Sequence, residues 1–120
     1  MRAVLLLALA ACALPALAAG DAARGREAYE ARCGGCHSVE ADRIGPRHAG
    51  VVGRKAGGVA GFDYSPALRA SGITWNATTL ERWLADPEAL VPGQRMGYSL
   101  ADAQARADIV AYLAALPAAR

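Results

Sequence analysis

The sequence predicts an all-α, single-domain fold in which helices and long loops wrap around a bound group. The chain has 120 residues, which is enough for one domain, and residues that start and stop helices recur along it. No run alternates apolar and polar residues as a β-strand does. Residues 45–61 are rich in glycine and form one long predicted loop. Such loops are unusual in compact domains unless they surround something, and with 6% aromatic residues the side chains alone would build a thin core.

The first 18 residues have the pattern of a secretory signal peptide. A positive start at Arg2 is followed by an apolar run over residues 3–14 and by the small residues of a cleavage site at residues 16–18. We therefore predict a cleaved signal peptide over residues 1–18, a domain over residues 19–120 and a periplasmic location. Two alternatives stay open, namely an uncleaved membrane anchor and a lipid anchor on Cys12.

Four helices are expected within the domain. The residues able to cap their first turns are Asp21, Ser65, Asn76 and Ser99, the last with Asp102 three residues on. The helices are expected to end near Cys33, before Gly72, at Asp86-Pro87 and at Pro117. In the last helix the apolar stripe that should face the core consists of Ile109, Val110, Leu113 and Leu116.

The charge of the domain is close to balanced. Once Arg2 leaves with the signal peptide, 12 Lys and Arg residues face 11 Asp and Glu residues. Binding to nucleic acid phosphates needs clustered basic charge, so this balance excludes nucleic acid as a partner. It also gives no polybasic segment that would hold the chain on a membrane surface.

Cys33, Cys36 and His37 belong to the stretch CGGCH, which is the attachment motif for c-type haem. Two thiols with two residues between them reach both vinyl groups of one porphyrin, and His37 is then held at the iron. A thioredoxin-like thiol pair would need a βαβ pattern, which the sequence lacks. A zinc site would need four ligands, and only His48 could join these three. We therefore predict one covalently bound haem c per chain, with His37 as an iron ligand.

Met96 is the candidate for the second axial ligand. It is the only methionine left once Met1 is removed, and it follows Pro92-Gly93, a turn that can present a side chain inward. A lone methionine is often core filler, and His48 and Lys55 are the other nitrogen donors. A methionine held by a constrained loop nevertheless fits His/Met ligation, which raises the reduction potential of a haem iron. An iron with both axial positions filled has no open site, which predicts a one-electron carrier rather than a haem enzyme or gas binder.

Taken together, these residues resemble those of the class I cytochromes c, specifically the mitochondrial type and its small bacterial relatives. The likeness covers the chain from Gly20 to Leu116, and it implies that Gly25 lets the first helix pack closely against Tyr112 on the last one. Besides the haem motif and Met96 with Pro92-Gly93, the matching motifs are Gly25 with Tyr29, Gly45-Pro46, Gly53-Arg54-Lys55, Gly61-Phe62 with Tyr64, Gly72-Ile73-Thr74-Trp75 and Ala111-Tyr112-Leu113.

The resemblance also implies further site residues and the partners. Pro46 would offer its carbonyl to the free ring nitrogen of His37. Tyr64 and Trp75 would donate hydrogen bonds to a haem propionate, and Arg54 would offset its charge. The implied partners are membrane redox complexes, such as a bc-type complex, an oxidase or a photosynthetic reaction centre. The chain would meet them as a monomer with only transient membrane contact, although a fixed subunit of a larger complex stays an alternative.

Several positions depart from the family pattern, and three of them concern the site and its docking rim. Trp83 stands where the mitochondrial type has a tyrosine that hydrogen-bonds the methionine sulfur, and indole is larger and only a donor. His48 replaces a usual leucine, and we expect it to be a packed or surface histidine. Glu88 replaces a frequent lysine at the docking rim, where Arg32 and Arg95 keep positive charge.

Overall fold

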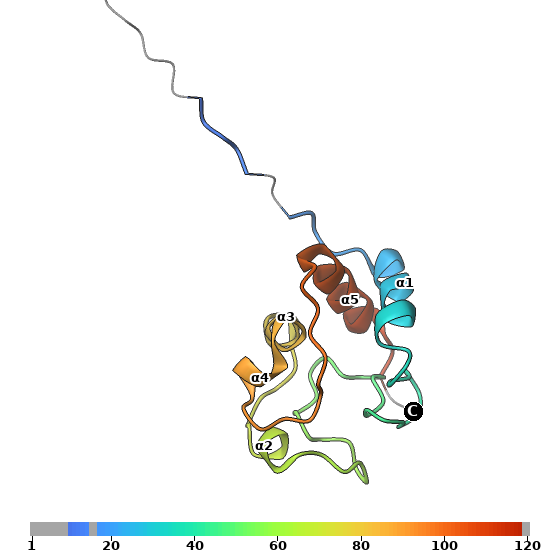
Figure 1. Cartoon of the computed structure of the whole chain (residues 1–120). Helices are drawn as coiled ribbons and strands as arrows, with labels where there is room; N and C mark the ends of the chain where they lie inside the picture. The colour runs from blue at the N-terminus through green and yellow to red at the C-terminus, as the bar shows by residue number, and fades with distance from the viewer. Residues whose placement is uncertain (1–9, 15–16, 119–120) are drawn as a thin grey trace, which may run out of the picture.

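The computed structural model describes residues 10–14 and 17–118. Within them the helices, in chain order, are α1 (Ala22–Arg32), α2 (Pro66–Arg69), α3 (Ala77–Ala85), α4 (Pro87–Leu90) and α5 (Ala103–Ala115). No strand occurs in this part of the chain, where one isolated bridge joins Lys55 to Thr74. The all-α prediction is confirmed. Figure 1 shows α1 and α5 side by side, α3 next to α5, and α4 beside α3.

The predicted signal peptide lies mostly outside the described residues, which omit residues 1–9 and 15–16. Residues 10–14 and 17–20 carry no helix. Residues 10–14 lie away from the domain (Figure 1), whereas the Ala18 carbonyl accepts from the Gln104 side chain on α5 at 3.2 Å. None of the helices in the described ranges is long and apolar enough to cross a membrane. Cleavage after residue 18 therefore stays a prediction.

Three of the four predicted helix starts are confirmed by their hydrogen bonds. The Asp21 side chain accepts from the Arg24 N–H at 2.8 Å, and the Ser65 hydroxyl accepts from the Leu68 N–H at 3.0 Å. Asn76 accepts from the Thr79 N–H at 2.9 Å, and the Thr79 hydroxyl accepts in turn from the Asn76 N–H. Each side chain satisfies an amide that the first turn of a helix leaves unpaired.

The fourth predicted start, at Ser99, is wrong. α5 begins after Asp102, whose carboxylate accepts from two amides, those of Gln104 at 3.0 Å and Ala105 at 3.1 Å. Upstream of that cap, Leu100 is buried and its N–H donates to the Leu84 carbonyl on α3 at 2.8 Å. Residues 99–101 are therefore held against α3 as non-helical chain.

α4 is a helix that the sequence did not lead us to expect. Asp86 ends α3, as predicted, but its carboxylate also accepts from the Ala89 N–H at 3.1 Å and so caps the next helix. Pro87 occupies the first turn, where its missing N–H does no harm. The Asp86-Pro87 pair therefore ends α3 and begins α4.

The close crossing of α1 and α5 fixes the frame of the domain. A Cβ on Gly25 would collide with the Asp108 carbonyl and lie 2.9 Å from Cβ of Tyr112, so the implied packing role of Gly25 is confirmed. Arg24 Nε also lies 3.0 Å from the buried Asp108 carboxylate. Ile109 at 0%, Val110 and Leu113 are buried as predicted, and Leu116 is partly buried. The rest of the buried core cluster consists of Tyr29, Val51, Ala56, Trp75, Leu80, Leu84 and Leu100.

Candidate haem site

One cavity of about 490 Å³ lies between the helices and the long loops. Its size is that of sites which enclose small organic molecules. Apolar side chains from α3 and α5, among them Leu80, Leu84, Ile109 and Leu113, form part of its wall. The structure brings all the predicted site residues to this one cavity, namely Cys33, Cys36, His37, Pro46, Arg54, Tyr64, Trp75 and Met96.

The CGGCH stretch forms a compact turn at the end of α1. Cys33 caps α1 with its N–H on the Tyr29 carbonyl at 2.8 Å, and the Cys33 carbonyl accepts from Cys36 at 3.1 Å and from His37 at 2.9 Å. Both thiols are free, that of Cys33 partly buried and that of Cys36 exposed. Burial raises the pKa of the Cys33 thiol to about 11. A raised pKa is the opposite of what activates the thiolate of a thiol–disulfide enzyme.

Arg43, which the sequence did not single out, holds this turn from outside. Its guanidinium donates to the Gly34 carbonyl at 2.6 Å and to the His37 and Gly35 carbonyls at 3.4 Å. Three carbonyls of the motif thus share one cation. Nothing in the local pattern six residues after His37 indicates this contact, because it depends on the path of the intervening loop.

The His37 ring is held with a defined tautomer. Its Nδ1 lies 3.0 Å from the Pro46 carbonyl, which only accepts, so Nδ1 carries the hydrogen and Nε2 keeps a free lone pair. Burial lowers the pKa of His37, which favours the neutral ring that a metal requires. A Cβ on Gly45 would overlap the ring, so the backbone there fits closely around the imidazole. His48 is partly buried and lines the same cavity, and its ring stacks on that of His37.

Three polar side chains face the cavity with donor capacity to spare. The Tyr64 hydroxyl accepts from the Val59 N–H at 3.0 Å, which leaves its own hydrogen free to donate. Trp75 is buried, and its indole N–H has no partner among the residues that the structure describes. Arg54 donates only to carbonyls, at 2.8 Å to Arg47 and at 3.3 Å to Ala49, and burial lowers its pKa. Together they can receive an anionic group, as a haem propionate is.

Met96 reaches the cavity from the loop between α4 and α5. Gly93, with φ at +90°, makes the turn before it in a conformation that other residues rarely adopt. The side chain is partly buried and lines the cavity with Trp83, which is also partly buried and has its ring centroid 5.4 Å from that of Trp75. Within the described ranges no group of three or more Cys, His, Asp and Glu is arranged to hold a metal ion.

These residues fit a haem. The cavity offers two thiols beside an imidazole with a free Nε2, and a thioether from another segment. Its walls are largely apolar, and hydrogen-bond donors with spare capacity could hold the acidic groups of a haem. Imidazole and thioether are the axial donors of electron-carrying haem proteins. The class that fold and site define is therefore the small all-α proteins that bind one haem covalently.

Comparison with known proteins shows the family. The chain belongs to the cytochrome c family, whose sequence model, described as "Cytochrome c", matches residues 22–117. Cytochrome c2 of Rhodomicrobium vannielii is 43% identical over 103 residues, which cover 82% of each chain. Cytochrome c 2.1 of Caenorhabditis briggsae is 42% identical over 98 residues, 79% of this chain and 88% of that one.

A solved structure agrees with these sequences. Cytochrome cH from Methylobacterium extorquens superposes with a TM-score of 0.75 at 45% identity, covering 79% of this chain and 98% of that one. The chain is thus a monohaem cytochrome c with covalently bound haem c. It is an electron carrier and not an enzyme.

Proposed function

We propose that this cytochrome loses residues 1–18 and carries single electrons through the periplasm between membrane redox complexes. A bc-type complex would be the donor, and an oxidase or a photosynthetic reaction centre the acceptor. The signal-peptide pattern supports export, and bacterial relatives named cytochrome c2 and cytochrome cH support a bacterial carrier. The near-neutral domain would work as a monomer that touches membranes only transiently.

Cys33 and Cys36 would form the two thioether bonds, and His37 and Met96 would be the axial ligands. When bound, the haem supplies an iron that takes up and releases one electron. Pro46 orients His37, while Tyr64, Trp75 and Arg54 would hold and neutralise a propionate. The observation that carries this assignment is that these side chains, from segments between residues 33 and 96, line one cavity.

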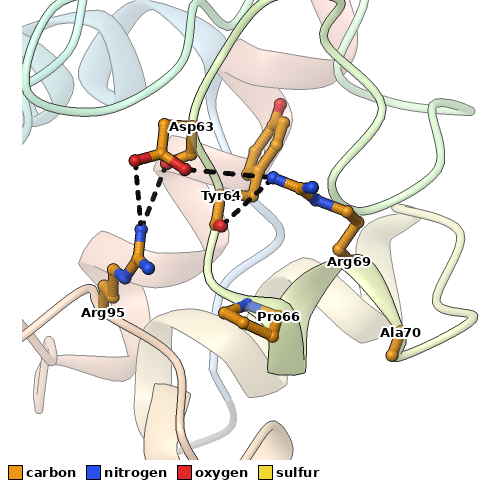
Figure 2. A pocket seen from close by; sticks show the side chains of 6 residues that line it. All are labelled: Asp63, Tyr64, Pro66, Arg69, Ala70 and Arg95. Atoms are coloured by element: carbon orange, nitrogen blue, oxygen red, sulfur yellow. Dashed lines mark hydrogen bonds and ion pairs between the residues drawn. The ribbon is translucent and has the colours of Figure 1, made fainter.

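The face used for docking would surround the chain near Cys33 and the Met96 loop, and its positive charge is smaller than the sequence indicates. Figure 2 shows Asp63 between Arg69 and Arg95. Its carboxylate lies 3.9 Å from Arg69 Nη2 and 3.7 Å from Arg95 Nη1. Beside the haem motif Ile44 lines the cavity and is 77% exposed. We therefore propose that short-range apolar contact contributes more to docking than long-range attraction.

The test is purification of the mature protein with absorption spectra in both redox states. A six-coordinate, low-spin iron with the weak long-wavelength band of a sulfur–iron bond is the expected result. A high-spin iron, or one that binds cyanide at once, would overturn the assignment of Met96.

The location needs its own test, which is the mass and cell fraction of the mature chain. Loss of residues 1–18 and recovery from the periplasm are expected, and Cys12→Ser should change neither. A chain that stays with the membrane and is released by Cys12→Ser would instead show a lipid anchor.

A further inference from the structure

His48 and His37 are stacked face to face. Their ring centroids lie 4.2 Å apart and their planes differ by 21°. The backbone builds this contact, because the His48 N–H donates to the Ser38 carbonyl at 3.1 Å and the Ala49 N–H to the Val39 carbonyl at 2.8 Å. The segment after His37 and the segment that carries His48 therefore lie alongside each other. The stack does not depend on the two side chains alone.

Tyr29 fixes the other side of His48. Its hydroxyl lies 2.9 Å from His48 Nδ1, and the two rings meet edge to face at 5.6 Å. Tyr29 itself is 4% exposed and packs between α1 and α5, with its ring 5.2 Å from that of Tyr112. The hydrogen bond to the Tyr29 hydroxyl therefore restrains the rotation of the His48 ring. A leucine in place of His48 could not form that bond.

The restraints on His37 complement one another. The hydrogen bond from Nδ1 to Pro46 fixes one point of the ring but permits tilting about that point. Contact over a whole ring face opposes such tilting, and His48 supplies it. The Gly45 backbone limits the ring on another side.

We propose that His48 is a positioning residue which, held by the Tyr29 hydroxyl, sets the plane of the His37 imidazole at the haem. The proposal rests on the proposed ligation by His37. Partners beyond the first ligand atom orient metal-bound histidines and tune the metal. In an oxidised low-spin haem, the plane of the axial imidazole, together with the orientation of the other axial ligand, sets how unpaired spin spreads over the porphyrin, and the proton shifts of the haem methyl groups report it.

The experiment compares the holoprotein with its Tyr29→Phe and His48→Leu variants by paramagnetic proton NMR and by reduction potential. Tyr112→Phe is the matched control, because it removes a hydroxyl from the neighbouring ring that makes no hydrogen bond to a described residue. Both test variants should change the spread of the haem methyl shifts and move the potential, His48→Leu more than Tyr29→Phe. Tyr112→Phe should change neither beyond error.

Two outcomes would overturn the proposal. One is a His48→Leu protein with the parental methyl shifts and only a lower unfolding midpoint, which would make His48 a packing residue. The other is equal shifts in Tyr29→Phe and Tyr112→Phe. Tyr29→Phe removes a single oxygen, so its methyl shifts decide between the two roles even if His48→Leu fails to fold. Failure of the ligand assignment itself would appear separately, as a high-spin spectrum of the parent protein.

Discussion

The carboxylate of Glu88 accepts a hydrogen bond of 2.9 Å from the backbone N–H of Gly93. Its second oxygen accepts from the Gln94 side chain at 3.1 Å. One carboxylate on α4 therefore holds two successive residues of the turn before Met96. From the sequence, Glu88 is notable only because it replaces a frequent lysine on the docking rim. Its contacts show that it also supports the loop that carries the proposed ligand Met96.

Replacement of Glu88 should loosen that loop. Glu88→Ala removes both hydrogen bonds, which at an exposed site contribute about 1 kcal/mol together. We expect the sulfur–iron band to disappear at a lower guanidinium concentration than in the parent. Glu27→Ala is the control, because Glu27 is exposed on α1 and its side chain bonds to no residue described in the structure. Equal midpoints for the two variants would mean that Glu88 does not support Met96.

Removal of the proposed sulfur ligand should have a larger effect. Met96→Ala should lose the long-wavelength band entirely and open the iron to added imidazole, because no other methionine remains once Met1 has left with the proposed signal peptide. Absorption spectra with increasing imidazole measure this. If the variant keeps the parental spectrum and excludes imidazole, the sixth ligand is another residue.

Trp83 offers an indole N–H that has no partner within the described part of the chain, and it lines the same cavity as Met96. If that N–H holds the sulfur, Trp83→Phe should shift the reduction potential and weaken the bond to iron. Voltammetry measures the reduction potential, and the sulfur–iron absorption band at increasing denaturant measures the strength of the bond. A variant equal to the parent in both would leave Trp83 as packing against Trp75.

Asp108 should make the domain sensitive to acid. Hydrogen bonds from Arg24 and then from the Asp21 N–H lower the pKa of its carboxyl to about 2, below the ordinary 3.8. The folded state therefore favours the charged form, so the stabilisation is complete above about pH 4 and is lost as the pH falls toward 2. Between these values Asp108→Asn should lose less stability than the parent. Urea unfolding of the parent and the variant at a series of pH values measures the free energy of unfolding. If that free energy depends on pH in the same way in both proteins, Asp108 is not the group that makes the domain sensitive to acid.

Electron transfer should depend weakly on salt. The near-neutral domain and the contact of Arg95 with Asp63 leave little charge for long-range attraction. Rates with the physiological acceptor should fall only slightly from low to high ionic strength, and Arg95→Glu should have a modest effect. A steep decrease would show that Arg32 and Arg95 act as a local positive cluster despite the balanced total.

The features predicted well are those that short segments determine. The haem motif spans five adjacent residues, and the caps at Asp21, Ser65 and Asn76 act within one turn. The sequence does not predict α4 because an Asp-Pro pair can either end a helix or begin one. Which of the two occurs depends on the residues that follow.

Features that join distant loops could not be predicted. The stack of His48 on His37 requires the pairing of residues 38–39 with residues 48–49, and the bonds of Arg43 require the same folded loop. The start of α5 was misplaced because Leu100 gains more from burial against α3 than from helical geometry. Tertiary contacts decided each of these cases.

The pairing of α1 with α5 has a consequence for the order in which the protein matures. Arg24 and Asp108 lie 84 positions apart, so the first helix finds its partner only after nearly the whole chain is available. Closing a loop of this length costs chain entropy, which the packing of the two helices must offset. Until residues 103–115 have been synthesised, Cys33 and Cys36 therefore lie at the end of a helix that lacks its packing partner.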